Sequence, residues 1–376
     1  MKIQLMTIVA LTMLTAMAAS DAVTIGTVCD EKYCGWPTVT KRANGEILVV
    51  FSGNREGHIC PYGKVQICRS SDNGKTWSAP VNIQESPFVD SRDAGIVELK
   101  DGTLLLNWFT SIAYRNNKQF QAFFEKQKKS DILADLGYWT ARSTDGGKTW
   151  EKKVRCNGSC PHNAIQLKSG RLMMLGRIYP SQDFHPDDVT NHTHEIIAEV
   201  SDDDGRSWRK LATLHTAEDI KSSELHEPYV VELKNGTLLG LIRYHGKVGG
   251  CSGTCQTESH DGGKTWTPIR RVPINGFPAH AIILKDGRIL VSYAKRDGGV
   301  EGEYAIFSSD NGKTWVDDRM IAPWGGWDIG YPSSVQLDDG RVMTVFYQAN
   351  YPNHKPAIKY AIWDPAYKPR YNAYKE

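Results

Sequence analysis

Short apolar runs separated by polar turns recur along the whole chain, which is typical of β-strands. Six of these runs begin shortly after a Gly that follows Asn, Asp or Ser, a combination that favours hairpin turns. The turn glycines are Gly45, Gly102, Gly170, Gly236, Gly287 and Gly340. The apolar runs that follow them are Ile47–Val49, Leu104–Leu106, Leu172–Met174, Leu238–Gly240, Ile289–Val291 and Val342–Thr344. The pattern predicts six β-hairpins in series.

A second repeat has the form Ser-x-Asp-x-Gly-x-Thr/Ser-Trp and occurs five times. Its copies are Ser70–Trp77, Ser143–Trp150, Ser201–Trp208, Ser259–Trp266 and Ser308–Trp315. The Asp carboxylate can accept hydrogen bonds from nearby backbone N–H groups, and the Gly permits a positive φ. The Trp is expected to pack back onto the sheet. Each copy is therefore predicted to be a turn between two strands.

The two repeats together predict an all-β fold of six units, about 59 residues each, enough for a four-stranded antiparallel propeller blade. We expect residues 23–376 to form one six-bladed β-propeller. The sixth copy of the second repeat is absent, and the strand Ala357–Trp363 is expected to close the ring. The segment Tyr114–Leu136 lacks Gly and Pro and predicts a helical insertion in the second blade, either a lid or a surface decoration.

The first 22 residues predict a secretory signal peptide. Lys2 precedes the apolar run Ile3–Met17, and Ala16-Met17-Ala18 matches the small-residue pattern of a cleavage site. Thr residues dilute this run, which argues against a membrane anchor, and no later stretch could span a bilayer. We therefore expect an exported protein, periplasmic or secreted, without a transmembrane segment.

Eight cysteines in an oxidising compartment favour disulfide bonds. Cys156/Cys160 and Cys251/Cys255 are close enough in sequence to form local bridges. Cys29 and Cys34 are expected to pair with each other or with Cys60 and Cys68. Zinc is the alternative, but CxxxC pairs spread this widely have poor zinc spacing.

The overall charge excludes one class of partner. The chain has 376 residues, 23% of them charged, and a formal net charge of +2. This near-neutral balance argues against a basic nucleic-acid face, so no nucleic-acid partner is expected. A local charged pocket remains compatible with it.

Aligning the six units on their turn glycines predicts a functional centre. The residue nine positions before each Gly is Trp36, Asp93, Pro161, Glu227, Pro278 and Tyr331. Neighbouring positions add Arg92, His162, His226 and His280, and the positions seven after the Gly include Arg177 and Arg243. The innermost strand of each blade begins near one mouth of the central channel. We therefore expect these polar side chains to line a pocket there.

The eight-residue repeat is identified as the Asp-box, also called the bacterial neuraminidase repeat, of sialidase-like β-propellers. The segment Leu225–Leu233, followed by Arg243, resembles the sialidase segment that holds the catalytic Glu and a substrate-binding Arg. Gly330–Val335 resembles the segment with the nucleophilic Tyr. The resemblance implies Tyr331 as nucleophile and Glu227 as its base, as in the sialidase exception among retaining glycosidases.

The chain departs from the sialidase pattern at four places. Gly35-Trp36-Pro37 stands where sialidases have Arg-Ile-Pro, and Glu303–Phe307 lacks the Arg that precedes the Asp-box of the fifth blade. The loop Arg55–Cys60 lacks the acid/base Asp, and Gln348 replaces the Glu after the last-blade Tyr. A three-arginine clamp on a sialic acid carboxylate therefore does not follow from the sequence.

Other residues are candidates for the missing roles. Asp93 is the first candidate for general acid, and His58 or a ring histidine the second. Arg92 is expected to bind a substrate acid or hydroxyl group. Trp36 offers either a stacking face for a sugar or core packing.

Two groups of residues have side chains that could bind a metal, but metal binding is not expected at either. The first is the group His162, His226 and His280, which has the ligand count of a catalytic zinc site. The second is a polar loop that contains Asp183, His185, Asp187, Asp188, His192 and His194.

Three functions remain open from the sequence. The first is an exported exo-glycosidase that hydrolyses a terminal sugar, sialic acid or another acidic sugar, from a glycan. The second is a polysaccharide lyase acting on a uronate-containing glycan, and the third is a glycan-binding propeller without catalysis. We expect a glycan or glycoconjugate as partner, no cofactor, and a monomer.

Overall fold

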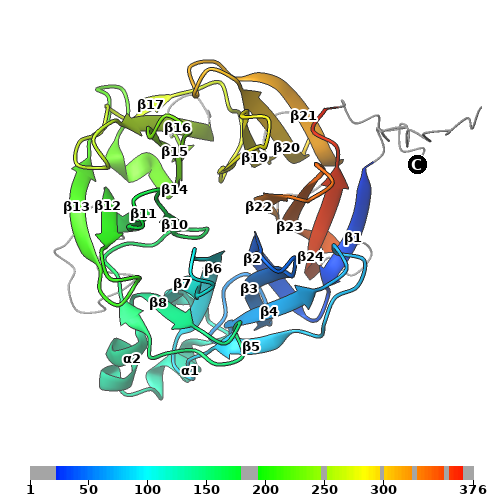
Figure 1. The fold of residues 1–376 in the computed structure, drawn as a ribbon. Coiled ribbons are helices and arrows are strands. Elements are labelled where there is room, and N and C mark those ends of the chain that lie inside the picture. Colours follow the sequence, from blue (N-terminus) through cyan, green and yellow to red (C-terminus); the bar gives the residue numbers. More distant parts are fainter. Residues whose placement is uncertain are drawn as a thin grey trace, which may run out of the picture.

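The computed structural model describes residues 23–178, 194–246, 252–296, 300–323, 328–350 and 355–366. Six four-stranded antiparallel sheets surround a central axis as the blades of a propeller (Figure 1). The expected fold class is therefore confirmed. The predicted signal peptide, residues 1–22, lies outside the described residues.

Each blade runs from an inner to an outer strand. Blade one contains β2 (Tyr33–Lys41), β3 (Ile47–Arg55), β4 (Lys64–Ser70) and β5 (Val81–Gln84). Blade two contains β6 (Asp90–Glu98), β7 (Leu104–Ser111), β8 (Tyr138–Ser143) and β9 (Val154–Arg155). Blade three contains β10 (Ile165–Gln166), β11 (Leu172–Ile178), β12 (Glu195–Ser201) and β13 (Arg209–Leu214).

The second half of the ring repeats this order. Blade four contains β14 (Leu225–Glu232), β15 (Leu238–His245), β16 (Ser252–Ser259) and β17 (Arg270–Arg271). Blade five contains β18 (His280–Ile283), β19 (Ile289–Lys295), β20 (Gly302–Ser308) and β21 (Val316–Pro323). Blade six contains β22 (Ile329–Gln336), β23 (Val342–Asn350), β24 (Lys355–Trp363) and, as its outer strand, β1 (Thr24–Cys29).

The ring closes through β1, which pairs with β24 in antiparallel register from Thr24↔Ile362 to Cys29↔Ile358. Blade six is thus built from both ends of the chain. The strand that we expected to close the ring, residues 357–363, forms part of β24 and is the third strand of this blade. The closure depends on a pairing between segments more than 300 residues apart in sequence.

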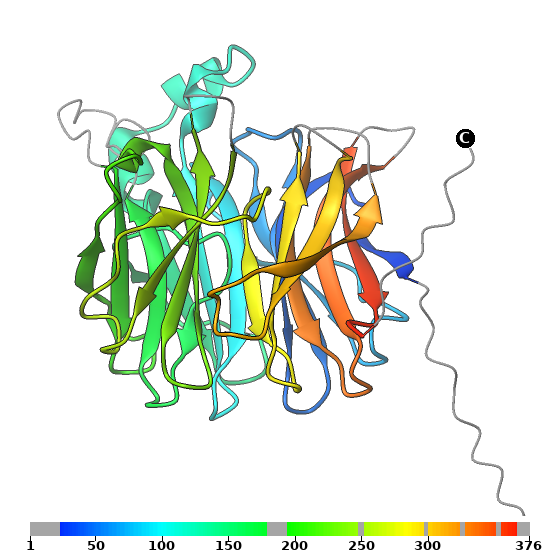
Figure 2. The same ribbon diagram turned by 90° about the horizontal axis from the view of Figure 1, so that it is seen from above.

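The insertion in blade two contains the 3₁₀-helix η1 (Ala113–Asn116) and the short helices α1 (Gln121–Glu125) and α2 (Lys129–Asp135). A further 3₁₀-helix, η2 (Ser222–Glu224), precedes β14. Figure 2 shows the insertion projecting beyond one end of the ring. Because Asp90 of β6 pairs with Ser111 of β7, the insertion follows β7 at the end where β6 begins. It therefore lies at the mouth where the inner strands begin.

The Asp-boxes form the turns that the sequence predicted. In the box of blade two, the Ser143 hydroxyl donates to Asp145 (2.8 Å) and accepts from the Gly147 N–H (2.8 Å). Asp145 also accepts from the backbone N–H (3.0 Å) and the hydroxyl (2.6 Å) of Thr149.

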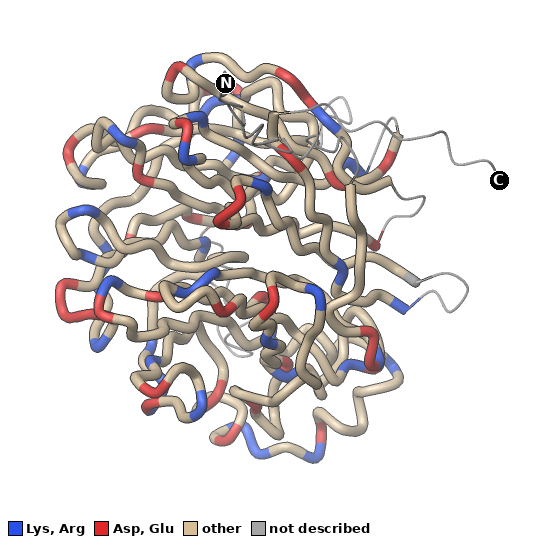
Figure 3. The backbone as a smooth tube through the Cα atoms, turned by 45° about the vertical axis from the view of Figure 1, so that its right-hand side comes forward, with Lys and Arg blue, Asp and Glu red and all other residues tan. Residues whose placement is uncertain are grey.

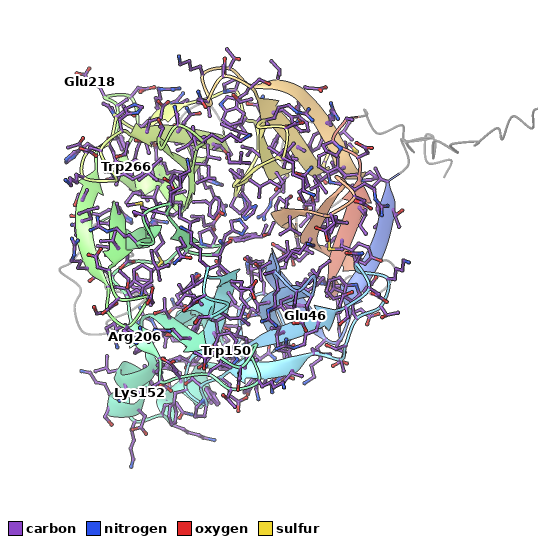
Figure 4. All side chains as sticks on the ribbon, in the orientation of Figure 1. Glu46, Trp150, Lys152, Arg206, Glu218 and Trp266 are labelled. Carbon is purple, nitrogen blue, oxygen red and sulfur yellow. The ribbon has the colours of Figure 1, made fainter. Side chains whose placement is uncertain are left out.

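The Trp residues of the Asp-boxes also connect blades, since the Trp208 indole of blade three donates to Thr140 of blade two at 3.0 Å. Figure 4 places Trp150 and Trp266 on the ring and Glu218 at its outer edge.

Lysines beside the hairpin turns join neighbouring blades at the opposite end. Lys100 donates to the carbonyl oxygens of Leu167 and Lys168, each at 3.0 Å. Lys168 in turn donates to two carbonyl oxygens of the next hairpin. In the view of Figure 3, basic and acidic residues are interspersed along the backbone. No helix within the described ranges is long and apolar enough to cross a bilayer.

The expected disulfide bonds are not present among the described cysteines, which are all free thiols: Cys29, Cys34, Cys60, Cys68, Cys156, Cys160 and Cys255. The sulfur atoms of Cys29 and Cys34 are 3.8 Å apart, well beyond a disulfide bond length. Cys156 and Cys160 are buried in the apolar core between blades, where free Cys packs as a small apolar side chain. Cys251, the expected partner of Cys255, lies outside the described residues.

Candidate active site

Four inner strands share an unusual backbone conformation at the same register. Trp36, Asp93, Glu227 and Tyr331 have φ values of 55°, 47°, 42° and 53°. The pairing of each inner strand with its neighbour shifts at this position. Such bulges re-aim side chains, and a positive φ in residues other than Gly is strained and clusters at functional sites. These four residues mark the strongest candidate for an active site.

Tyr331 and Glu227 form the centre of the site. The Tyr331 hydroxyl donates a hydrogen bond to Glu227 Oε1 at 2.5 Å. Arg243 Nη1 donates to both oxygens of Glu227, at 2.9 and 2.8 Å. The structure thus brings together the three residues that the sialidase resemblance singled out.

The protonation states of this pair follow from their surroundings. Burial would raise the pKa of Glu227, but the charge and hydrogen bonds of Arg243, with the hydrogen bond from Tyr331, lower it to about 2. Burial raises the pKa of Tyr331 well above 10, and the negative charge of Glu227 raises it further. The resting site therefore contains a neutral phenol that donates to a carboxylate.

Asp93 is a second carboxyl group at the site, and it is 5% exposed. Its Oδ1 atom is buried and has no hydrogen-bond partner among the described residues. Burial raises the pKa of Asp93 to about 7, and the charge of Glu227 adds to the rise while Arg92 opposes it. A carboxyl group of this pKa can both donate and accept a proton near neutral pH.

Trp36 occupies the blade-one position. The guanidinium carbon of Arg92 lies 4.1 Å from the centroid of the Trp36 ring, and that of Arg55 lies 4.7 Å from it. Arg55 forms two hydrogen bonds with Asp90, at 2.5 and 2.8 Å. Because Trp36 is only 1% exposed, its ring packs in the core and supports arginines, and little of it is open to a sugar.

Arg296 is a site residue that the sequence alignment missed. Its guanidinium carbon lies 5.6 Å from the Tyr331 ring centroid and 5.4 Å from that of Phe277. The Phe277 ring also lies 4.2 Å from the guanidinium carbon of Arg243. Arg296 follows the end of β19, two positions beyond the offset that found Arg177 and Arg243. Gly330 makes room for it, since a Cβ there would lie 2.6 Å from Arg296 Nη2.

His58 lies in the blade-one loop where the acid/base Asp was missing. Its Nδ1 is 2.8 Å from the Tyr33 hydroxyl and 3.3 Å from Asp328. Its ring is 5.1 Å from the Trp36 ring. Burial lowers the pKa of His58, although Asp328 opposes the shift. His58 therefore borders the site on the side of Trp36.

Two of the three histidines that we expected around the central channel are buried in the core. His162 and His280 are fully buried, with ring centroids 4.9 Å apart, and burial lowers the pKa of His162 to about 3 and that of His280 well below 6.5. The His162 ring lies 6.4 Å from that of Tyr331. These neutral rings form the floor beneath the site.

His226 lies apart from these two rings. It contacts Arg177, which also hydrogen bonds to His194 at 3.0 Å. No group of three or more His, Cys, Asp or Glu residues in the described part of the chain is arranged to hold a metal ion. The other members of the polar loop considered for a metal, residues 183–192, lie outside the described residues.

A separate cavity of about 550 Å³ lies beside the insertion, since its lining residue Tyr62 contacts Phe120 and Phe123. Its lining includes Lys32, Tyr62, Lys64 and Glu85. None of the residues around Tyr331 lines it, so it is distinct from the candidate active site.

Comparisons with known proteins agree with this fold. The family model described as BNR repeat-like domain matches residues 112–344. A search of curated proteins found no match. A solved structure of a protein of unknown function from Dyadobacter fermentans has a TM-score of 0.71 and 26% identity, over 91% of this chain and 98% of that one.

Two further solved structures share the fold at lower identity. The NanB sialidase from Streptococcus pneumoniae has a TM-score of 0.67 and 16% identity, over 91% of this chain and 70% of that one. An alpha-L-arabinofuranosidase from Fusarium graminearum has a TM-score of 0.61 and 14% identity, over 92% and 99% of the two chains. This chain belongs to the BNR repeat-like domain family, with the sialidase-like six-bladed β-propeller fold.

Proposed function

We propose that this chain is an exported exo-glycosidase that hydrolyses a terminal sugar of complex glycans. The observation that carries the proposal is the hydrogen bond from Tyr331 to Glu227, with Glu227 held by Arg243. An anomeric carbon that carries a negatively charged group repels a carboxylate nucleophile. A neutral phenol avoids this repulsion, and a neighbouring carboxylate can take its proton during the attack. The fold shared with a sialidase and an arabinofuranosidase supports a glycosidase.

In the first step, the Tyr331 oxygen attacks the anomeric carbon and its proton passes to Glu227. The bond from the anomeric carbon to the leaving oxygen breaks, and protonated Asp93 donates its proton to that oxygen. Because the pKa of Tyr331 is raised and that of Glu227 is lowered in the resting site, the proton stays on the tyrosine until attack begins.

In the second step, the Asp93 carboxylate takes a proton from a water molecule whose oxygen attacks the anomeric carbon. The Tyr331 oxygen departs and recovers its proton from Glu227. Two displacements at one carbon retain the anomeric configuration. The pKa of Asp93, about 7, suits a group that acts first as acid and then as base.

Hydrolysis of a panel of 4-methylumbelliferyl glycosides and reducing-end-labelled oligosaccharides tests this proposal. We expect release of one terminal sugar with retention, seen by NMR of the first product, and loss of release in Tyr331→Phe. Tyr62→Phe is a matched control, because Tyr62 is 37% exposed and lines the separate cavity beside the insertion.

Two results would overturn the proposal. A product that contains an ultraviolet-absorbing double bond and has incorporated no water would identify a lyase. Binding of glycans without turnover of any member of the panel would identify a lectin-like propeller.

We also propose that residues 1–22 direct export and that residues 23–376 form the mature domain. The apolar run followed by Ala16-Met17-Ala18 supports this. Amino-terminal sequencing of the protein recovered from the periplasm or medium tests it. A cytoplasmic protein with an intact Met1 would contradict it.

A further inference from the structure

The cavity beside the insertion has a partly exposed aromatic ring on its wall. Its volume of about 550 Å³ falls within the roughly 300–1,000 Å³ of pockets that bind small ligands. Tyr62 is 37% exposed, and its ring makes T-shaped contacts with Phe120 and Phe123 of the insertion, with centroids 5.9 and 5.6 Å apart. These contacts fix the orientation of the ring while part of its surface stays open. Such a ring suits stacking against the C–H face of a sugar.

The charged groups of the cavity wall are balanced in sign. Among the described residues, two lysines and two glutamates line it. Lys64 forms an ion pair with Glu85. Lys32 donates a hydrogen bond to the side-chain oxygen of Asn54 at 2.7 Å, and Glu56 is the second carboxylate. An ammonium group donates hydrogen bonds and a carboxylate accepts them, whereas each sugar hydroxyl can do both. The lining therefore suits a neutral sugar.

The cavity and the candidate active site share a wall. Asn54 and Glu56 line the cavity, whereas Arg55 between them is 1% exposed and packs against the Trp36 ring. The segment before β2 divides in the same way. Lys32 lines the cavity, and the next residue pairs with Arg55 and hydrogen bonds at the edge of the site.

The rest of the cavity wall is fixed on both sides. Gly63 lies between two lining residues, and a Cβ there would lie 2.0 Å from Asp90 Oδ1 and 2.2 Å from Arg55 Nη1. This part of the wall therefore packs directly on the buried ion pair of the site. On the side of the insertion, the Ser86 hydroxyl donates to Asp135 of α2 at 2.5 Å. The cavity is thus held between the site and the insertion.

The cavity lies at the mouth of the propeller where the inner strands begin. Lys32 directly precedes β2, and the insertion projects beyond the same end of the ring (Figure 2). The Trp36 ring lies 6.4 Å from that of Tyr331, and Arg55, in the shared wall, lies 4.7 Å from Trp36. A terminal sugar on Tyr331 would leave the rest of its glycan at this mouth, next to the cavity.

We propose that this cavity binds neutral sugar residues of the glycan beyond the terminal sugar, with the Tyr62 ring as stacking face and the Lys32 ammonium as hydrogen-bond donor. The place of the cavity in the reaction rests on the proposed function, whereas the binding itself does not. The cavity makes glycans of several sugars better ligands than short ones.

Binding of neutral disaccharides to Tyr331→Phe tests the cavity without turnover. The probes for saturation-transfer NMR and calorimetry are lactose, N-acetyllactosamine, cellobiose and mannobiose. We expect at least one of them to bind with a Kd of about 1 mM or lower. Adding Tyr62→Ala should weaken this binding about tenfold or more, whereas Tyr62→Phe keeps the ring and should retain it. Absence of binding by all four probes up to about 10 mM, or unchanged binding in Tyr62→Ala, would overturn the inference.

A pair of lysine variants tests the polar side of the cavity without touching the insertion. Lys32 precedes β2, and Lys41 lies at the other end of the same strand, where it pairs with Asp338 at 2.9 Å. We expect Lys32→Met to weaken disaccharide binding about threefold or more and Lys41→Met to leave it unchanged. Equal affinities in the two variants would contradict the role of Lys32. This comparison decides the question even where Tyr62→Ala fails to fold.

The effect of chain length on cleavage tests the place of the cavity in the reaction. The measured quantity is kcat/KM for an oligosaccharide divided by kcat/KM for the aryl glycoside of the same terminal sugar. We expect Tyr62→Ala to lower this ratio about tenfold, mainly through a higher KM for the oligosaccharide. A ratio equal to that of the native protein would show that the cavity does not serve the cleaved glycan.

Failure of this inference and failure of the proposed function give different results. Tyr331-dependent cleavage of glycosides, with no disaccharide binding to Tyr331→Phe, refutes the sugar-binding cavity and leaves the glycosidase intact. Disaccharide binding that depends on Tyr62 and Lys32, without turnover of any glycoside, supports the cavity and refutes the glycosidase.

Discussion

Replacing Asp93 by Asn should lower activity and at the same time stabilise the fold. The Oδ1 atom of Asp93 is buried and has no hydrogen-bond partner among the described residues. Burial raises its pKa from 3.8 to about 7, which corresponds to about 4 kcal/mol of unfavourable free energy for the ionised form in the folded protein. Asn is neutral at every pH and tolerates the left-handed φ of 47° at this position.

The sign of the effect follows from proton linkage. The folded pKa lies above the unfolded value, so the stability contributed by the protonated group is complete below about pH 4 and is lost as the pH rises through 7. Asp93→Asn does not titrate. It should therefore match the native protein near pH 4 and exceed its free energy of unfolding by up to about 4 kcal/mol at pH 8.

Asp90→Asn provides a control on the same strand. Asp90 accepts two hydrogen bonds from Arg55, and both side chains are almost fully buried. Breaking this pair leaves a buried guanidinium without its partner and should cost about 3–5 kcal/mol. The same change of carboxylate to amide, three residues apart, should thus shift stability in opposite directions.

Urea unfolding at pH 4 and pH 8 and kinetics on two substrate types measure both consequences. Loss of the general acid should lower kcat/KM by about 10²–10⁴ on a natural glycoside, and less on an aryl glycoside with a good leaving group. The native enzyme should lose activity above about pH 7, where Asp93 ionises. An Asp93→Asn variant that is less stable than the native protein at pH 8, or fully active on the natural glycoside, would refute this reasoning.

Three further predictions follow from the geometry of single residues. Tyr331→Phe should retain the native melting temperature within a few degrees and lower kcat by about 10³-fold or more, measured by single-turnover kinetics, whereas retained turnover would exclude the nucleophile. Gly95→Ala should destabilise the protein by about 1–3 kcal/mol or prevent folding, because a Cβ there would lie 2.2 Å from the His162 carbonyl oxygen. Urea unfolding measures the loss, and Gly57→Ala, where a Cβ would meet no atom within 4 Å, should leave the free energy of unfolding unchanged. Backbone and side-chain hydrogen bonds from Thr76 lower the pKa of Asp72 to about 2, so its contribution to stability should be present above about pH 4 and lost as the pH falls through 2; circular dichroism should show a flatter acid transition in Asp72→Asn.

The sequence was sufficient for the blades because each blade carries its own local signals. A turn Gly in every blade and an Asp-box in five of them mark where strands end, to within a few residues, and both recur in chain order. The closing strand β1 has no such signal, since Thr24–Cys29 pairs with a segment that lies more than 300 residues away. The alternation of apolar residues cannot identify a partner at that separation.

The site was predictable where it follows the strand register and was missed where it does not. Counting nine residues back from each turn Gly found Asp93, Glu227 and Tyr331, because the inner strands of these blades bulge at the same distance from the turn Gly. Arg296 and Phe277 lie outside the strands, where the residue number does not predict the direction in which a side chain points. Cysteine spacing failed for a similar reason, because proximity in sequence does not determine whether two side chains point toward each other.

The four bulged strands and the two remaining inner strands divide the centre between chemistry and support. Trp36, Asp93, Glu227 and Tyr331 reach their positions through a positive φ, which the proline ring forbids in the two blades that have Pro at the same register. In blade three, His162 directly follows the proline, and in blade five, His280 lies two positions after it. Both imidazole rings are buried and neutral, and the centroid of the His162 ring lies 4.9 Å from that of His280 and 6.4 Å from that of Tyr331. The residue at this one register thus distinguishes four blades that place a bulged Trp, Asp, Glu or Tyr near the centre from two blades that place a buried histidine there.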